Sequence, residues 1–125
     1  MRDQGGALVN KAKSILDQLQ DRLTDPARTR ESKGYRFLEL AEAVECADGL
    51  RMSVQASRTH YCTPREDTGP WLCVEVDFPT SCVEALMPYA ESPDDPTGTV
   101  YGYVPIEIVA SVIEAHGGFK AESQS

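Results

Sequence analysis

Two short stretches with an apolar residue at every second position most constrain the fold of this chain. They cover residues 50–56 and 72–78, and in both the residues between the apolar positions are mainly polar. The apolar positions are Leu50, Met52, Val54, Ala56, Leu72, Val74, Val76 and Phe78. Such alternation is typical of a strand with one buried face. It predicts that Glu75 and Asp77 share the opposite, outer face of the second stretch.

Two further segments complete a sheet. Residues 38–46 alone fit a helix or a strand, but the turn-forming Ala47-Asp48-Gly49 that follows favours a hairpin with residues 50–56. Residues 99–104 are the expected fourth strand. Between the third and fourth strands, Pro79, Pro88, Pro93 and Pro96 exclude a long regular element, although residues 81–87 have room for one or two helical turns.

A helix is expected on each side of the sheet segments. Residues 8–24 carry apolar side chains at steps of three and four, and Pro26 ends that pattern. A polar connector covers residues 26–36. In the second helix, residues 105–116, Pro105 opens the first turn and Gly117-Gly118 ends it. We therefore expect one domain, residues 1–125, in the α+β class: a four-stranded antiparallel sheet over roughly residues 37–104 with both helices on one face.

The charge is distributed unevenly. Residues 1–65 carry 11 Lys or Arg and 9 Asp or Glu, whereas residues 66–125 carry 1 and 11. No Lys or Arg occurs from Glu66 to Phe119. A surface of this kind favours a cationic partner, and it repels nucleic acid and anionic membranes. The alternative is a solvated acidic face that keeps a small protein soluble.

Two groups of residues are candidates for partner binding. The loop of residues 59–71 combines aromatic and Arg side chains, which anchor many interfaces, although Trp71 also suits packing over the rim of the sheet. Several acids in the second half have the spacing to imitate a nucleic-acid backbone, which carries about one charge per 3.4 Å on each strand. The candidate partner-binding residues are Tyr61, Arg65, Trp71, Glu75, Asp77, Glu91, Asp94 and Asp95.

Catalytic and metal chemistry have weaker support. The N-terminus lacks an apolar export signal, which predicts a cytoplasmic protein whose cysteines (Cys46, Cys62, Cys73, Cys82) are free thiols. His60 and Cys62, with Cys73 and Cys82, supply zinc-type ligands without the usual close pairs. A thiol enzyme would use Cys62 as nucleophile and His60 or His116 as base. We expect neither an enzyme nor a cofactor.

Two segments carry a family resemblance. Residues 52–79 (MSVQASRTHYCTPREDTGPWLCVEVDFP) and 100–118 (VYGYVPIEIVASVIEAHGG) resemble uncharacterised small accessory proteins of bacteriophages and prophages. The resemblance covers under half of the chain and transfers no functional residue. It implies an accessory role similar to that of anti-CRISPR proteins, which occupy surfaces of nucleic-acid-handling defence complexes.

Three functional hypotheses follow. The first is a non-catalytic, phage-encoded inhibitor that binds a basic surface of a host nucleic-acid-handling defence complex and so blocks nucleic-acid access. The second is a small homodimeric interaction or assembly protein of a phage, in which the helix Leu8–Leu23 packs against its twin. The third is a zinc- or thiol-dependent enzyme.

Overall fold

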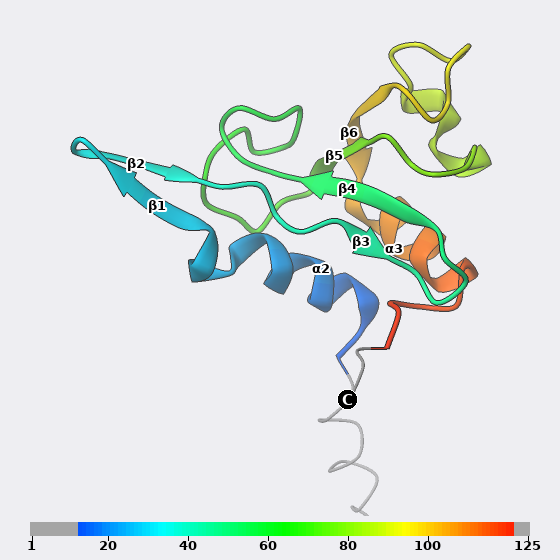
Figure 1. The fold of residues 1–125 in the computed structure, drawn as a ribbon, viewed down its shortest axis with the longest axis horizontal. Helices are drawn as coiled ribbons and strands as arrows, with labels where there is room; N and C mark the ends of the chain where they lie inside the picture. Colours follow the sequence, from blue (N-terminus) through cyan, green and yellow to red (C-terminus); the bar gives the residue numbers. More distant parts are fainter. Residues whose placement is uncertain (1–12, 122–125) are drawn as a thin grey trace, which may run out of the picture.

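A four-stranded antiparallel sheet forms the centre of the protein (Figure 1). The computed structural model describes residues 13–121. The neighbouring strands, in order across the sheet, are β3 (Val44–Glu45), β4 (Arg51–Gln55), β5 (Cys73–Asp77) and β6 (Val100–Pro105). The predicted α+β class is therefore confirmed.

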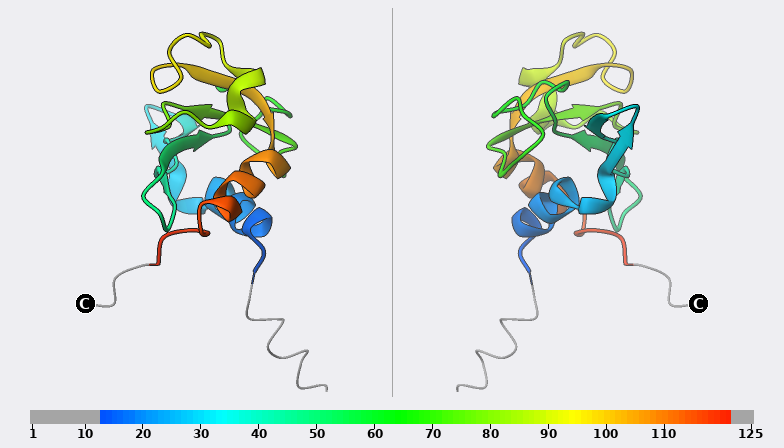
Figure 2. Two further views of the ribbon diagram at one scale, coloured as in Figure 1. Left: turned by 90° about the vertical axis from the view of Figure 1, so that its right-hand side faces the viewer. Right: turned by 90° about the vertical axis from the view of Figure 1, so that its left-hand side faces the viewer.

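The two α-helices of the described segment lie side by side on one side of the sheet (Figure 2). They are α2 (Ile15–Thr24) and α3 (Ile106–Ala115). Apolar side chains of both helices and of the sheet form one buried cluster, and the burial of this surface is the main driving force for folding. The cluster includes Leu19, Leu23, Met52, Val54, Val74, Val76, Val104, Val109, Val112 and Ile113.

The first helix is shorter than the predicted 8–24 within the described segment. Ser14 is its N-cap, and the Ser14 hydroxyl accepts a hydrogen bond from the amide of Asp17 at 3.0 Å. The helix ends at Thr24, as Pro26 predicts. Residues 8–12 of the prediction lie outside the described residues.

The predicted polar connector, residues 26–36, was wrong. A 3₁₀ turn, η1 (Pro26–Arg28), leads into a hairpin of β1 (Thr29–Ser32) and β2 (Tyr35–Leu38), which we call the arm. The arm extends away from the sheet (Figure 1). Lys33 and Gly34, with φ of 51° and 84°, form its turn. None of its residues is in the buried core, so the strands lack the apolar alternation that would have revealed them.

Residues 38–46 are not one continuous strand. β2 ends at Leu38, and only Val44 and Glu45 pair with β4. Between them the side chain of Gln55 replaces a backbone partner: its amide group donates to the carbonyl of Ala41 and accepts from the amide of Ala41, both at 2.9 Å. The hairpin around residues 47–49 is confirmed, with Gly49 at a φ of 100°.

The third strand departs from the predicted pattern at its ends and on its outer face. Val74 and Val76 are buried as expected, but Phe78 lies beyond β5 with a φ of 53° and is 56% exposed. Leu72 is also exposed. Glu75 and Asp77 are both buried instead of exposed to solvent. The loop that precedes β5 lies against Glu75, which accepts a hydrogen bond from the amide of Tyr61.

The C-terminal half follows the prediction closely. A short 3₁₀ helix, η2 (Glu84–Tyr89), occupies the Pro-rich segment. β6 runs directly into α3, with Pro105 as the N-cap rather than the first helical residue. Gly117 and Gly118 have φ of 94° and 85°, and the amide of Gly118 donates to the carbonyl of Ile113 at 2.8 Å. This ends the helix as expected.

Candidate functional site

The loop of residues 59–71 is fixed across the two C-terminal strands. The amide of Tyr61 donates to Glu75 Oε1 at 2.9 Å, and the carbonyl of Tyr61 accepts from the amide of Tyr103 at 3.0 Å. Tyr61 and Arg65 are exposed, and the Arg65 guanidinium lies 5.2 Å from the centre of the Tyr61 ring. Both residues therefore remain accessible to a partner.

Trp71 is a core residue and not a contact residue. It is 1% exposed, and its indole N–H donates to the carbonyl of Glu66 at 3.2 Å. The side-chain amide of Gln20 donates a hydrogen bond of 2.7 Å to the backbone carbonyl of Trp71. The predicted role of Trp71 at an interface is therefore corrected: this side chain joins the loop to the core.

Tyrosine side chains from three separate segments line a shallow, open hollow of about 380 Å³ on the surface. We call it the tyrosine groove; its lining residues are Tyr61, Pro88, Tyr89, Ala90, Glu91, Gly102 and Tyr103. The rings of Tyr61 and Tyr103 are 5.9 Å apart and tilted by 43°. Gly102 leaves room for Tyr61 to lie close to β6, because a Cβ there would make a tight contact of 3.2 Å with the Cβ of Tyr61. The sequence prediction missed Tyr89 and Tyr103.

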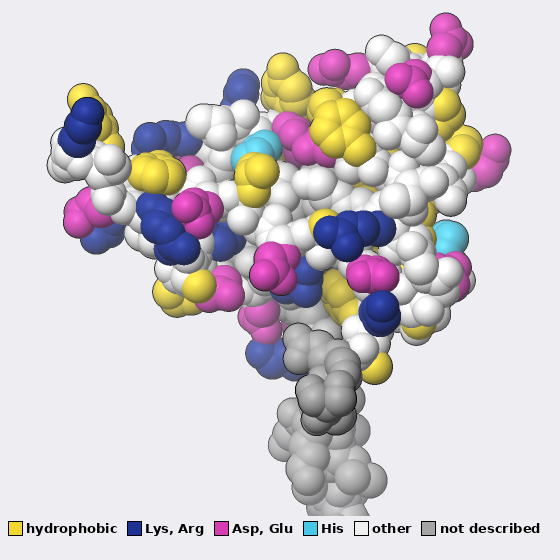
Figure 3. Space-filling view, in the orientation of Figure 1, with side chains coloured by type: hydrophobic (Ala, Val, Ile, Leu, Met, Phe, Trp, Pro, Cys, Tyr) yellow, Lys and Arg dark blue, Asp and Glu magenta, His cyan; other side chains and the backbone are white. Residues whose placement is uncertain are grey.

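The segment Glu91–Gly98, here called the acidic loop, begins at the edge of the tyrosine groove. Glu91, Asp94 and Asp95 are all exposed, as predicted. The loop is anchored at both ends, because the amide of Glu91 donates to the carbonyl of Val100 at 2.9 Å and the Tyr101 hydroxyl donates to the carbonyl of Pro96 at 2.5 Å. The lobe that carries η2 and this loop shows acidic but no basic side chains (upper right in Figure 3).

Glu75 and Asp77 form a buried carboxyl pair. Each residue is 8% exposed, and Asp77 Oδ1 has no hydrogen-bond partner. Burial, then the adjacent carboxyl of Glu75, then the charge of Glu91 raise the pKa of Asp77 to about 8. Asp77 is therefore mostly protonated at pH 7. The expectation that both carboxylates act as surface charges is corrected accordingly.

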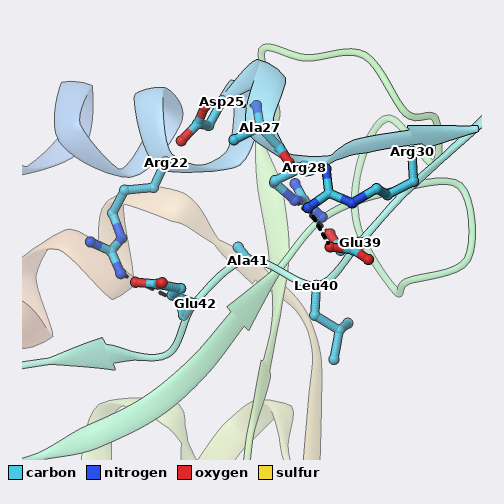
Figure 4. A pocket seen from close by; sticks show the side chains of 9 residues that line it. All are labelled: Arg22, Asp25, Ala27, Arg28, Arg30, Glu39, Leu40, Ala41 and Glu42. Atoms are coloured by element: carbon cyan, nitrogen blue, oxygen red, sulfur yellow. Dashed lines mark hydrogen bonds and ion pairs between the residues drawn. The ribbon is translucent and has the colours of Figure 1, made fainter.

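A second hollow, of about 350 Å³, lies at the base of the arm (Figure 4). Three arginines and three acids line it, so its charge is balanced: Arg22, Arg28, Arg30, Asp25, Glu39 and Glu42. The exposed Arg30 pairs with Glu39 at 3.1 Å. The buried Arg28 instead donates to the backbone carbonyls of Leu23, Glu39 and Ala56. Arg28 therefore joins three backbone segments, and we call this arrangement the brace.

The geometry gives the thiol-enzyme and zinc hypotheses no support. The buried Cys62 thiol donates to the carbonyls of Ser57 and Pro64, and burial raises its pKa, which opposes formation of a thiolate. His60 Nδ1 is 2.7 Å from the hydroxyl of Ser57, and His116 Nδ1 is 2.6 Å from Asp48 Oδ2. Among residues 13–121, no three His, Cys, Asp or Glu side chains are grouped to hold a metal ion.

The apolar stripe of the first helix packs in part against the core of its own chain. Leu19 and Leu23 are buried within the chain, and Ile15 and Leu16 pack partly against the same core. Leu8 and Ala12 of the stripe lie outside the described residues. Packing through the described part of this helix would therefore compete with the fold of the monomer.

Comparisons with known proteins leave the site to be interpreted from its own chemistry. No helix within the described part of the chain has the length and apolar character needed to cross a membrane. No protein-family model, curated protein or solved structure matches this chain.

Proposed function

We propose that this protein is a non-catalytic inhibitor that binds a basic surface of a nucleic-acid-handling complex. One observation carries the proposal: an anchored, exposed acidic loop adjoins an aromatic groove, and the lobe that carries this loop has no Lys or Arg. Aromatic side chains supply contact area at interfaces, and a surface that carries only acidic side chains attracts positive charge. A Lys- or Arg-rich surface that normally holds nucleic acid fits both features.

The inhibitor is proposed to act by occupying the surface of the partner that normally binds nucleic acid. Its acidic loop would compete with phosphate groups for the same cationic side chains, and the body of the protein would exclude nucleic acid sterically. We place this activity in the cytoplasm of a bacterial host, as the resemblance to phage accessory proteins and to anti-CRISPR proteins implies. Surface charges act mainly on the association rate and are weakened by salt.

Charge reversal of the acidic loop tests the proposal. In the variant with Glu91→Lys, Asp94→Lys and Asp95→Lys, binding to the partner is expected to weaken about 100-fold, at about 1 kcal/mol per reversed charge. Tagged protein is incubated with host lysate, and retained proteins are identified at increasing salt. The kinetics with the purified partner are then compared by surface plasmon resonance, where the loss is expected mainly in the association rate.

The control reverses two exposed acids of α3, Glu107→Lys and Glu114→Lys, on an element outside the lobe that carries the acidic loop (Figure 1). This variant is expected to retain the partner almost as well as the wild type. A partner that binds the triple loop variant as tightly as the wild type, with the same salt response, would contradict the proposal.

A further inference from the structure

We infer that the tyrosine groove is a binding site for one cationic side chain of the partner, an arginine or a lysine, with Glu91 as its counter-ion and the buried Glu75–Asp77 pair linked to the groove through the amide of Tyr61. This inference rests on the proposed function, since it names the part of the basic partner that the groove would recognise.

The tyrosine rings provide the first part of the argument. A guanidinium or ammonium group is attracted to the face of an aromatic ring within about 6 Å of its centre. Tyr61 already accepts such a group from the same chain, because Arg65 lies 5.2 Å from its centre. Tyr103 is 47% exposed beside Tyr61 and has no such cation of its own among the described residues. The groove therefore presents an available ring face.

The acids provide the second part. Glu91 lines the groove and is exposed, so its carboxylate is available to a cation that sits on the rings. Its charge also acts on Asp77, which has an unpartnered and buried Oδ1. Glu75 Oε1 already accepts from the amide of Tyr61. A cation in the groove would therefore offset the repulsion among three carboxyl groups.

Proton release follows from this repulsion. A cation beside Glu91 favours the ionised form of Asp77 and lowers its pKa, so the bound complex holds fewer protons than the free protein. By linkage, the affinity for the cation must rise as the pH rises towards 8. Other charged or titratable groups around the pair are Arg51, His60, Cys62 and Arg65. Burial lowers the pKa of His60, so this residue stays neutral above pH 7.

The test uses a blocked arginine, N-acetyl-arginine methylamide, whose guanidinium stays charged throughout. It is titrated into the full-length protein between pH 7 and 8, and aromatic NMR signals of the tyrosines are followed. Tyr61, Tyr89 and Tyr103 are expected to shift with saturation, while Tyr35 on the arm serves as an internal reference. The apparent affinity is expected to rise about threefold to fivefold over this pH unit, because a group with a pKa of about 8 is about one-tenth ionised at pH 7 and half ionised at pH 8.

Two variants identify the groups responsible. Glu91→Gln, at an exposed position, is expected to weaken binding at every pH, whereas Asp77→Asn should remove its pH dependence. Glu107→Gln on α3 is the matched control and should behave as the wild type. Equal shifts of Tyr35 and Tyr103, no shift at all, or an unchanged pH dependence in Asp77→Asn would overturn the inference. If the inference fails but the partner is still captured, and this capture requires Asp94 and Asp95, the proposed function would stand.

Discussion

The free energy of unfolding is expected to fall by about 1.4 kcal/mol per pH unit from about pH 6.5 to about pH 8, and then to level off. The cause is Asp77. An ordinary Asp in the unfolded chain loses its proton near pH 3.9, whereas burial and the neighbouring carboxyl of Glu75 raise the pKa of Asp77 to about 8 in the folded protein. In this interval the folded state binds more protons, so stability decreases as the pH rises.

Urea denaturation across this pH range measures the effect. Asp77→Asn is expected to abolish the decrease, and at pH 9 this variant should be more stable than the wild type by several kcal/mol, since an amide carries no charge to bury. The range starts near pH 6.5 because partial burial lowers the pKa of His60, which gives stability an opposite slope below that value. Asp94→Asn is the exposed control. An Asp77→Asn variant that keeps the slope would show that another group is responsible.

Replacement of the buried Arg28 is expected to cost about 3 kcal/mol of stability, because each buried carbonyl left without a donor costs about 1 kcal/mol or more. Arg28→Ala removes the donors to Leu23, Glu39 and Ala56, whose carbonyls lie 2.7, 2.8 and 3.3 Å from guanidinium nitrogens. These three carbonyls belong to α2, the segment after β2 and the segment after β4. Loss of the brace therefore affects several elements together.

The matched variant is Arg30→Ala. Arg30 is exposed and pairs with Glu39 at 3.1 Å, and exposed pairs contribute at most about 1 kcal/mol. Urea denaturation of both variants at pH 7 gives the comparison. If Arg28→Ala lost no more stability than Arg30→Ala, the hydrogen bonds from Arg28 to these carbonyls would not contribute to the free energy of unfolding.

Local patterns predicted the parts of the fold that depend on neighbouring residues. The turn at residues 47–49, the alternation in β4 and the glycine stop after α3 all follow from short-range chemistry. The arm was missed because its strands bury no core side chain. Alternation placed Glu75 and Asp77 opposite Val74 and Val76 correctly, but it contains no information about how the preceding loop folds back against Glu75.

The candidate site was predictable only in part. The absence of Lys and Arg from residues 66–119 pointed to Glu91, Asp94 and Asp95. The composition of the loop of residues 59–71 pointed to Tyr61 and Arg65. The groove itself requires Tyr61, Tyr89 and Tyr103 to meet from three segments, which no sequence spacing indicates. Conversely, Trp71 has the composition of an interface anchor, and only its surroundings show that it belongs to the core.

The arm also bears on how the chain tolerates changes in length. Because none of its residues is in the buried core, extra or missing residues at the Lys33-Gly34 turn would leave the apolar packing of the body intact. Arg28, which binds backbone carbonyls of the body, lies at the point where the arm joins the body. Beyond this residue, the hairpin is expected to tolerate a change in length or an inserted tag without loss of the core packing.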